Sequence, residues 1–489
     1  MLVSWAAVAS CPTPPPTPTD RYEALISTYE AKPLRLVLLE VLGLLGTPLC
    51  GEHSPALPLI EHCVVVCVDT EAWTTNTDEM TEIGLVVAEY ADGKKLNGDL
   101  GQYAENVLKK MKYHHLRICE NAHLRTNADW MRGPEGNRFG ESRFVTFAEA
   151  RSILDEVLNQ TITSDNPAVA GLKRPIVLIG HALAHDKDNV RKTGLNYDFK
   201  QHGSVVKEID TQKVVKETLA WIDPRCANND IGLDTLCEKV FGFAHDDPHT
   251  ALNDAARTVI CAVNLALRNW TRNNRFEKTV QEVALELEQY TQNTFESNWG
   301  TKLCCTRCGG RDHSNTQNEC ATPVHCAACE RFHETTDGNS EVDKKEHMSS
   351  HIEQYCLAVA EFNAWKRRVN DAHRKRNSLP AGPPPGSHPP SKWRGRWPMK
   401  SPSDMLVPEP PPPFVRPVLA TQGDVPATSA PVPGVRRIVF QSTGRQRPEK
   451  ARGIRKQVPR GADRNLGDGD QAAKKKTRAE DVAWNGTAW

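Results

Sequence analysis

Residues 63–73 read CVVVCVDTEAW, and this stretch decides the fold because it is the most strand-like segment of the 489-residue chain. Its valines favour a buried β-strand, which ends with two carboxylates, Asp69 and Glu71. Side chains two residues apart on a strand point to the same face, so these carboxylates project together. Their repulsion is relieved by a hard divalent cation with oxygen ligands. An Asp-x-Glu pair alone is ordinary at strand ends, so the metal site predicted here depends on the rest of the chain.

Strand and helix signals alternate from residue 61 to residue 270. The run TEIGLVVAEY (81–90) predicts a strand beside the first, and residues 174–192 and 204–219 each predict a strand that runs into a helix. An amphipathic helix over 231–243 and a long helix over 248–270, with Pro248 near its first turn, complete the pattern. This alternation predicts an α/β domain. Residues 101–142 show weaker periodicity, and we expect an insertion there.

Three more residues join the carboxylate pair in the predicted site. Asp186 ends the run GHALAHD, at the opening of a helix after a buried strand, and HTALNDA supplies His249 and Asp254. Five helical steps separate two side chains by about 140°, so His249 must lean in from the loop or the first turn. Alone, His249 would be a capping or surface histidine, and Asp186 a helix N-terminal charge. Together the five residues indicate a catalytic metal site.

At these five residues the chain resembles the DEDDh 3′-to-5′ exonucleases of the ribonuclease H-like superfamily. Asp69 and Glu71 match the first motif, Asp186 the second, and His249 with Asp254 the third. The resemblance covers about residues 55–270. The flanking runs YHHLRICENAHL (113–124) and FGES (139–142) look like fungal exonuclease-like proteins associated with mRNA export. His185 departs from the pattern, because the family often has an aromatic or apolar residue there.

The resemblance implies a fold and a reaction. The fold is a mixed central sheet flanked by helices, and the reaction is hydrolysis of terminal phosphodiester bonds of single-stranded nucleic acid, with release of 5′-mononucleotides. Two Mg²⁺ or Mn²⁺ ions would be held by the four carboxylates, with His249 as general base. Trp73 could stack on the terminal base, although a packed core or rim tryptophan is the more usual role. RNA is favoured over DNA as the substrate; a DNA exonuclease and a catalytically silent RNA-binding adaptor are the alternatives.

Seven cysteines lie between Cys304 and Cys356, with spacings typical of zinc sites. One partition makes two sites, Cys305, Cys308, His313 and Cys320 followed by Cys326, Cys329, His351 and Cys356, with His333 as a rival ligand. The competing partition takes Cys305, Cys308, Cys326 and Cys329 as one zinc ribbon. Such a module would grip single-stranded RNA beside the nuclease, or serve a structural or protein-binding role.

The formal net charge of zero hides two unlike parts. Residues 361–489 hold 25 Lys and Arg against 11 Asp and Glu, and 17 of the 34 prolines lie between Pro380 and Pro433. From about Ser378 onward the chain lacks sustained apolar periodicity and cannot bury enough apolar surface to fold, so we expect a disordered basic tail, which we begin at residue 361. It suits a polyanion or an import receptor, or is merely solvated. Nuclear residence is an expectation from these basic clusters.

The remaining segments suggest an intracellular protein without a membrane anchor. The first residues lack a positively charged region, so we expect no signal peptide, and the scattered cysteines favour a reducing compartment. The apolar run 34–46 is too short to span a bilayer and predicts a helix docked on a domain. The oligomeric state is left open. We expect six segments: a disordered N-terminus (1–20), a docking helix and linker (21–54), the exonuclease domain (55–270), a linker helix (271–300), the zinc module (301–360) and the tail (361–489).

Overall fold

The computed structural model describes residues 16–124, 132–222, 230–315, 319–332 and 341–376. These residues belong to one compact unit of the chain. The disorder predicted for residues 1–20 is wrong for residues 18–20, which open helix α1 (Pro18–Ala31). The predicted disorder of residues 1–15 and of the tail beyond residue 376 lies outside the described residues. No helix of the described part is long and apolar enough to cross a membrane.

A six-stranded mixed sheet forms the centre of the fold, with strand order β4-β3-β2-β1-β5-β6. Strand β2 is antiparallel to both β1 and β3, whereas β1, β5 and β6 run parallel, as do β3 and β4. The fold is therefore the predicted α/β class with a mixed central sheet. The strands are β1 Val64–Ala72, β2 Met80–Glu89, β3 Lys112–Ile118, β4 Ser142–Val145, β5 Ile176–Gly180 and β6 Val205–Asp210.

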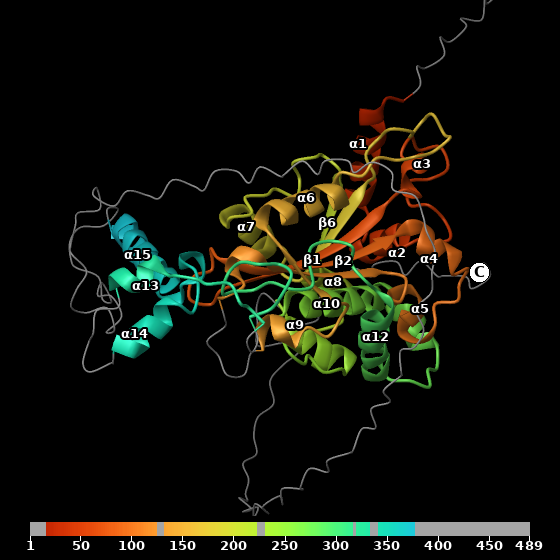
Figure 1. Cartoon of the computed structure of the whole chain (residues 1–489). Helices are drawn as coiled ribbons and strands as arrows, with labels where there is room; N and C mark the ends of the chain where they lie inside the picture. Colours follow the sequence, from red (N-terminus) through yellow and green to blue (C-terminus); the bar gives the residue numbers. More distant parts are fainter. Residues whose placement is uncertain (1–15, 125–131, 223–229, 316–318, 333–340, 377–489) are drawn as a thin grey trace, which may run out of the picture. The chain divides into compact units, whose positions relative to one another are not determined.

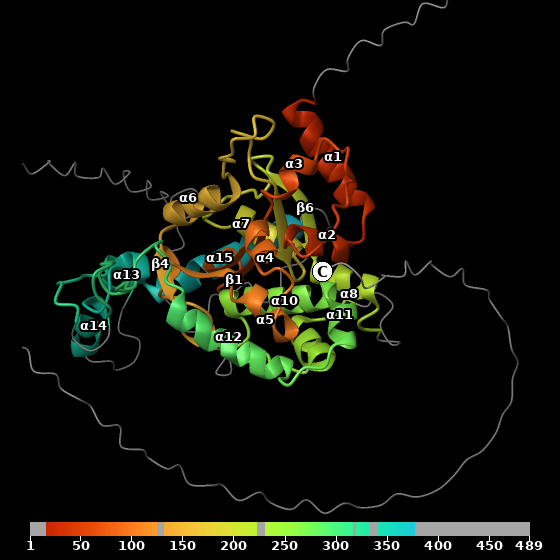
Figure 2. The same ribbon diagram turned by 90° about the vertical axis from the view of Figure 1, so that its right-hand side faces the viewer.

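Helices cover both faces of the sheet (Figures 1 and 2). Helix α10 (Ala251–Ala266) packs on one face against β1 and β2, together with α2 and α8. Helices α6 and α7 pack on the other face. Alternation along β1 explains this: Val65 and Cys67 face the α10 core, while Val64, Val66 and Val68 face the second core. Every residue of α10 is buried, so it forms the central helix of its layer.

The other helices between residues 16 and 294 are shorter. They are α1 Pro18–Ala31, α2 Leu34–Val41, α3 Leu57–Ile60, α4 Tyr90–Lys95, η1 Gln102–Ala104, α5 Glu105–Leu108, η2 Cys119–Asn121, η3 Gly133–Gly136, α6 Phe147–Leu158, α7 Ala184–Lys192, α8 Thr211–Thr218, α9 Leu233–Thr235, η4 Leu236–Phe241, α11 Arg268–Asn273 and α12 Val280–Thr294. Helix α2 buries Val37, Leu38 and Val41 in the core shared with α10, as the docked-helix prediction requires. Helix α12, predicted as a linker, also packs into that core through Ala284 and Leu287.

The predicted insertion at residues 101–142 is wrong. This segment contributes β3 and the start of β4, so it is part of the sheet. Its strand pattern is hidden because two consecutive histidines, His114 and His115, take buried positions that apolar residues usually fill. Each ring has a polar partner inside the fold, Ser297 for His114 and Glu82 for His115. Partners of this kind offset the cost of burying polar groups.

The C-terminal region is helical for longer than predicted. It contains α13 Ala327–Phe332, α14 Glu341–Met348, η5 Glu353–Tyr355 and α15 Leu357–Arg376. Disorder predicted from residue 361 is therefore wrong up to residue 376. Helix α15 has apolar positions that pack: Ala364 is buried against Trp73 and Leu124. These few contacts stabilise the helix. Its many charged residues are the reason that the sequence predicted it as part of the disordered tail.

Candidate active site

The end of β1 presents Asp69 and Glu71 to the edge where α7 and α10 begin. Asp69 lies opposite Gly84 of β2, and Glu71 lies opposite Glu82. The Oδ2 atom of Asp69 is buried and has no hydrogen-bond partner among the described residues. Burial, together with the charges of neighbouring carboxylates, raises the pKa of Asp69 well above its usual value. An ionised Asp69 therefore needs a positive partner.

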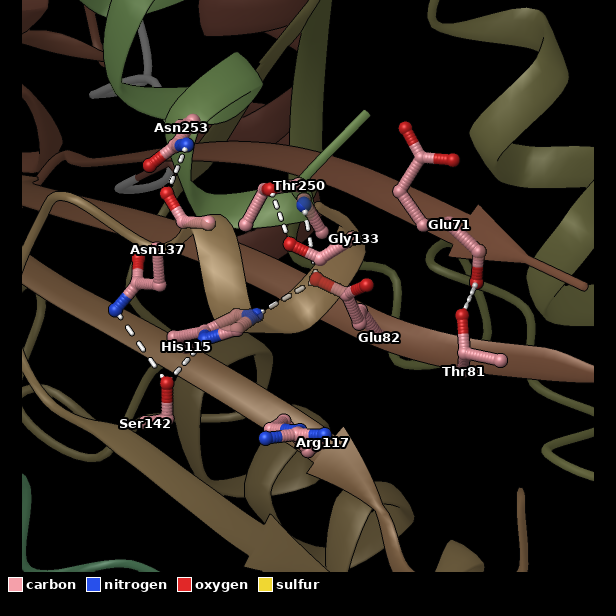
Figure 3. Close-up of polar contacts among 12 residues, drawn as sticks. Glu71, Thr81, Glu82, His115, Arg117, Gly133, Asn137, Ser142, Thr250 and Asn253 are labelled. Atoms are coloured by element: carbon pink, nitrogen blue, oxygen red, sulfur yellow. Dashed lines mark hydrogen bonds and ion pairs between the residues drawn. The ribbon is translucent and has the colours of Figure 1, made fainter. Parts of the chain in front are cut away.

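Glu71 is half-buried and faces His249. Its Oε1 atom lies 3.6 Å from Nδ1 of His249, and its backbone carbonyl accepts a hydrogen bond from Thr81 (Figure 3). Burial raises the pKa of Glu71 to about 7, although the hydrogen bond with His249 opposes this shift. The same contact raises the pKa of His249 above its usual value. The contact between the two side chains thus favours a negatively charged Glu71 and a positively charged His249.

Asp186 reaches the end of β1 from the first turn of α7. Its Oδ1 atom accepts hydrogen bonds from the backbone N–H and the hydroxyl of Thr70, at 2.8 and 2.9 Å. Burial raises the pKa of Asp186 to about 7 despite these two bonds. Thr70 lies between Asp69 and Glu71, so it ties α7 to the strand position where the acidic pair projects.

His249 and Asp254 arrive together at the start of α10. Thr250 is the N-cap, and His249 precedes it with φ of 59°, so His249 leans in from the loop as the five-residue spacing indicates. The backbone N–H of His249 donates to Oδ2 of Asp254 over 3.1 Å. The Oδ1 atom of Asp254 lies 2.8 Å from Nε2 of His245. Asp254 is therefore fixed by both ends of one short loop.

The structure brings the five candidate residues to one place. Oxygen and nitrogen atoms of Glu71, His249 and Asp254 lie within 4.8 Å of one another, and the charges of Asp186, Asp254 and Glu71 all act on Asp69. Four carboxylates gathered in one place fit hard divalent cations, which prefer oxygen ligands. The unpartnered Oδ2 of Asp69 is a suitable ligand atom for such an ion.

Sequence reasoning missed three residues at this site: Thr70, His245 and Glu82. No sequence motif marks Thr70, because its role depends on its hydrogen bonds to Asp186, which form only when α7 packs against β1. His245 lies in the run FAHDDPH close to the third motif, but only the folded loop turns it towards Asp254. Glu82 lies in a mostly apolar strand. Its burial beside His115 cannot be predicted from the neighbouring residues in the sequence.

Trp73 does not have the geometry predicted for base stacking. Strand β1 ends at Ala72 after a bulge, and the Trp73 side chain is 1% exposed. It packs against Leu124 and Ala364 in a small separate cluster. The more usual role, a packed tryptophan, is the one observed, because α15 covers a residue that would otherwise lie at the rim.

The cysteine cluster forms two four-residue groups, each with its ligand atoms within 4.8 Å of one another. They are the groups of the two-site partition: Cys305, Cys308, His313 and Cys320, then Cys326, Cys329, His351 and Cys356. The one-ribbon partition is not the grouping observed, and His333 lies outside the described residues.

Both histidines of these groups have the surroundings expected of zinc ligands. Nε2 of His313 lies 3.3 Å from Sγ of Cys308, while Nδ1 lies 2.7 Å from a carboxylate oxygen of Asp312. Nε2 of His351 lies 3.6 Å from Sγ of Cys329, and Nδ1 lies 2.7 Å from the hydroxyl of Ser350. A second ring nitrogen held in this way fixes the tautomer of a metal-binding histidine. The residues therefore fit two tetrahedral Zn²⁺ sites.

The fold is a mixed α/β sheet with helices on both faces, and the carboxylates at the end of β1 form a candidate divalent-metal site. Residues 64–265 match a family model described as DNA polymerase III subunit epsilon-like, C-terminal domain (DEDDh_C). The match covers less than half of the chain, and it shows that these residues are similar to the DEDDh exonuclease family. Members of that family use divalent metals, which agrees with the carboxylates gathered at the end of β1.

Comparison with solved structures finds similarity to exonuclease I of E. coli. One is the zinc-bound exonuclease I–ssDNA complex, at 12% identity and TM-score 0.25, and another is exonuclease I itself, at 13% identity and TM-score 0.25. Each match covers 42% of this chain and 41% of the exonuclease I chain. No curated protein matches the sequence.

Proposed function

We propose that the chain is a divalent-metal-dependent 3′-to-5′ exonuclease acting on single-stranded nucleic acid, with RNA as the favoured substrate. The observation that carries this proposal is the convergence of Asp69, Glu71, Asp186, His249 and Asp254 at the ends of β1, α7 and α10. Degenerate nuclease folds lose one or more acidic ligands, and none is missing here. The products would be 5′-mononucleotides.

The four carboxylates would hold two Mg²⁺ or Mn²⁺ ions. When bound, such ions activate a water molecule and stabilise the charge that develops on the phosphoryl and leaving oxygens. The buried, mutually repelling carboxylates favour cation binding, because a cation relieves the charge that raises their pKa values.

His249 would accept the proton of the attacking water. Imidazole suits this task because its pKa lies near working pH. Contact with Glu71 orients the ring, and the hydrogen bond from the His249 amide to Asp254 fixes its backbone. The side chain is 48% exposed, so water can reach it.

The remaining segments would serve the nuclease domain, which we place at residues 55–270. The zinc module, residues 301–360, would grip single-stranded RNA beside it. The basic tail would bind a polyanion or an import receptor and direct the protein to the nucleus. A reporter fused to residues 361–489 should accumulate in the nucleus. If this fusion were found only in the cytoplasm, the proposed localisation would be refuted.

The test of the proposed function is degradation of 5′-labelled and 3′-labelled single-stranded RNA and DNA with Mg²⁺ or Mn²⁺. The variants are Asp186→Asn and His249→Ala. Asp188→Asn is the matched control, because Asp188 lies on the same helix but is exposed and pairs only with Lys192 in the described structure. We expect stepwise 3′ shortening by wild type and the control, loss of shortening in both site variants, and faster turnover of RNA.

Other outcomes would change the proposal in defined ways. Faster turnover of DNA would reverse the substrate preference and keep the reaction. Cleavage from the 5′ end would overturn the direction. Retained binding without cleavage under either metal would favour the adaptor.

A further inference from the structure

A chain of buried polar contacts crosses three strands next to the site (Figure 3). A carboxylate oxygen of Glu82 on β2, Oε2, lies 2.8 Å from Nε2 of His115 on β3. Nδ1 of His115 lies 2.7 Å from the hydroxyl of Ser142 on β4. The side chains of Glu82 and His115 are 2% and 0% exposed. A buried carboxylate is retained at such a position only with partners of this kind.

The same carboxylate holds the N-terminus of α10. Oε2 of Glu82 accepts a hydrogen bond from the backbone N–H of Ala251, the first residue of α10, over 3.3 Å. The first N–H groups of a helix have no partner within the helix, so a carboxylate from the sheet satisfies one of them and complements the helix dipole. Gly84 permits this approach, because a Cβ there would overlap the carbonyl of Ala251.

A second set of bonds joins this helix end to the loop before β4. The hydroxyl of Thr250 donates to the carbonyl of Gly133 over 2.7 Å, and the amide of Asn253 donates to the carbonyl of Gly136 over 3.0 Å (Figure 3). The first turn of α10 is thus held from the sheet and from the loop. His249 and Asp254 flank this turn, so its position fixes theirs.

We infer that Glu82 is a positioning residue of the nuclease, which places His249 and Asp254 by anchoring the first turn of α10 to buried His115 and, through it, to Ser142. This inference rests on the proposed function. Glu82 does not touch the nucleic acid, because it is buried. Its role is to place the groups that act on the substrate.

The direction of the hydrogen bonds tells how each substitution acts. With its ring proton on Nε2, His115 donates to the carboxylate of Glu82 and accepts a hydrogen bond from the Ser142 hydroxyl at Nδ1. A glutamine at position 82 whose carbonyl oxygen takes the place of Oε2 can still accept from both the Ala251 N–H and the Nε2–H of His115. Glu82→Gln therefore preserves the anchor, whereas Glu82→Ala removes it.

Steady-state kinetics of the full chain on a single-stranded oligonucleotide test the inference. For Glu82→Ala we expect kcat to fall about 10- to 100-fold while KM stays within about threefold. Glu82→Gln should recover most of the lost kcat. Glu89→Gln is the control, because Glu89 lies at the other end of β2, where it pairs with Lys112 and Arg174; its kcat should equal that of wild type. The inference would be overturned if Glu82→Ala had the kcat of wild type. It would also be overturned if the fall in kcat only matched the fraction of the variant that is unfolded.

Hydrogen exchange measured by mass spectrometry gives a second readout that needs no activity. Peptides covering residues 249–254 should exchange faster in Glu82→Ala and in Ser142→Ala than in wild type, while residues 259–266 of the same helix stay unchanged. The Ser142→Ala variant keeps the test open if Glu82→Ala does not fold. Unchanged exchange at residues 249–254 in both variants would refute the anchor. An inactive wild type would refute the proposed function alone, and the exchange data would still decide whether Glu82 anchors α10.

Discussion

Nδ1 of His249 lies 3.6 Å from Oε1 of Glu71, so the residue that precedes α10 meets the last carboxylate of β1. This contact brings together two motifs that are 178 positions apart in the chain. It also couples their protonation, because each group shifts the pKa of the other. The site is therefore assembled by packing α10 on the sheet.

His249→Ala should lower kcat by about 10²-fold or more, because a positioned general base contributes that much to a proton transfer. The melting temperature should hardly change, since the side chain is half exposed. Kinetics on 3′-labelled single-stranded RNA measure the loss. His185→Ala is the control, an exposed histidine next to Asp186. A kcat within about threefold of wild type for His249→Ala would exclude the general-base role.

Stability without added Mg²⁺ or Mn²⁺ should depend on Glu71 and on pH. The folded pKa of Glu71 is raised from 4.5 to about 7, so the folded state binds this proton more tightly than the unfolded state. The resulting stability is present below about pH 4.5 and is lost as pH rises through about 7.

Glu71→Gln, a neutral isostere, should therefore melt a few degrees above wild type at pH 8 and at nearly the same temperature at pH 5. Mn²⁺ should then stabilise wild type more than the variant at pH 8. Calorimetric melting curves at the two pH values check this. A Glu71→Gln advantage at pH 5 that disappears at pH 8 would show that the sign is wrong.

Gly84→Ala should destabilise the α/β domain by about 3 kcal/mol or more, because the added Cβ overlaps the backbone of Ala251 and pushes α10 from β2. Denaturant unfolding measures the change. Gly46→Ala is the control, since no atom lies within 4 Å of a Cβ at that position. Equal stability of the two variants would mean that α10 does not lie directly on β2.

The sequence predicted the parts of the fold that follow a local period. The strand with Asp69 and Glu71, the strand-to-helix run ending at Asp186 and the helix carrying Asp254 all have such a period. It could not predict β3, because buried His114 and His115 are polar by type and acceptable only through partners far along the chain. The same applies to the site. The motif residues could be predicted from the sequence, whereas Glu82 acquires its role only when α10 packs over Gly84.

Trp73→Ala should lower the free energy of unfolding by about 3–5 kcal/mol, because it removes a large buried side chain and leaves a cavity. Trp73→Phe should restore most of this stability, since an aromatic ring still fills part of the space beside Leu124 and Ala364. Denaturant unfolding and oligonucleotide affinity are measured for both variants. A stable Trp73→Ala protein with weakened affinity would instead support base stacking.

Zinc content should distinguish the two partitions of the cysteine cluster. Two separate four-residue groups predict two Zn²⁺ per chain, and Cys308→Ser or Cys329→Ser should each leave one, because each variant removes a thiolate from one group alone. Cys304→Ser is the control: Cys304 is buried next to Cys305 but belongs to neither group, so both ions should remain. Elemental analysis of protein purified without chelator gives the count. One Zn²⁺ in wild type and none in either Cys308→Ser or Cys329→Ser would favour a single ribbon that shares these ligands, and the geometry of two groups would then be wrong.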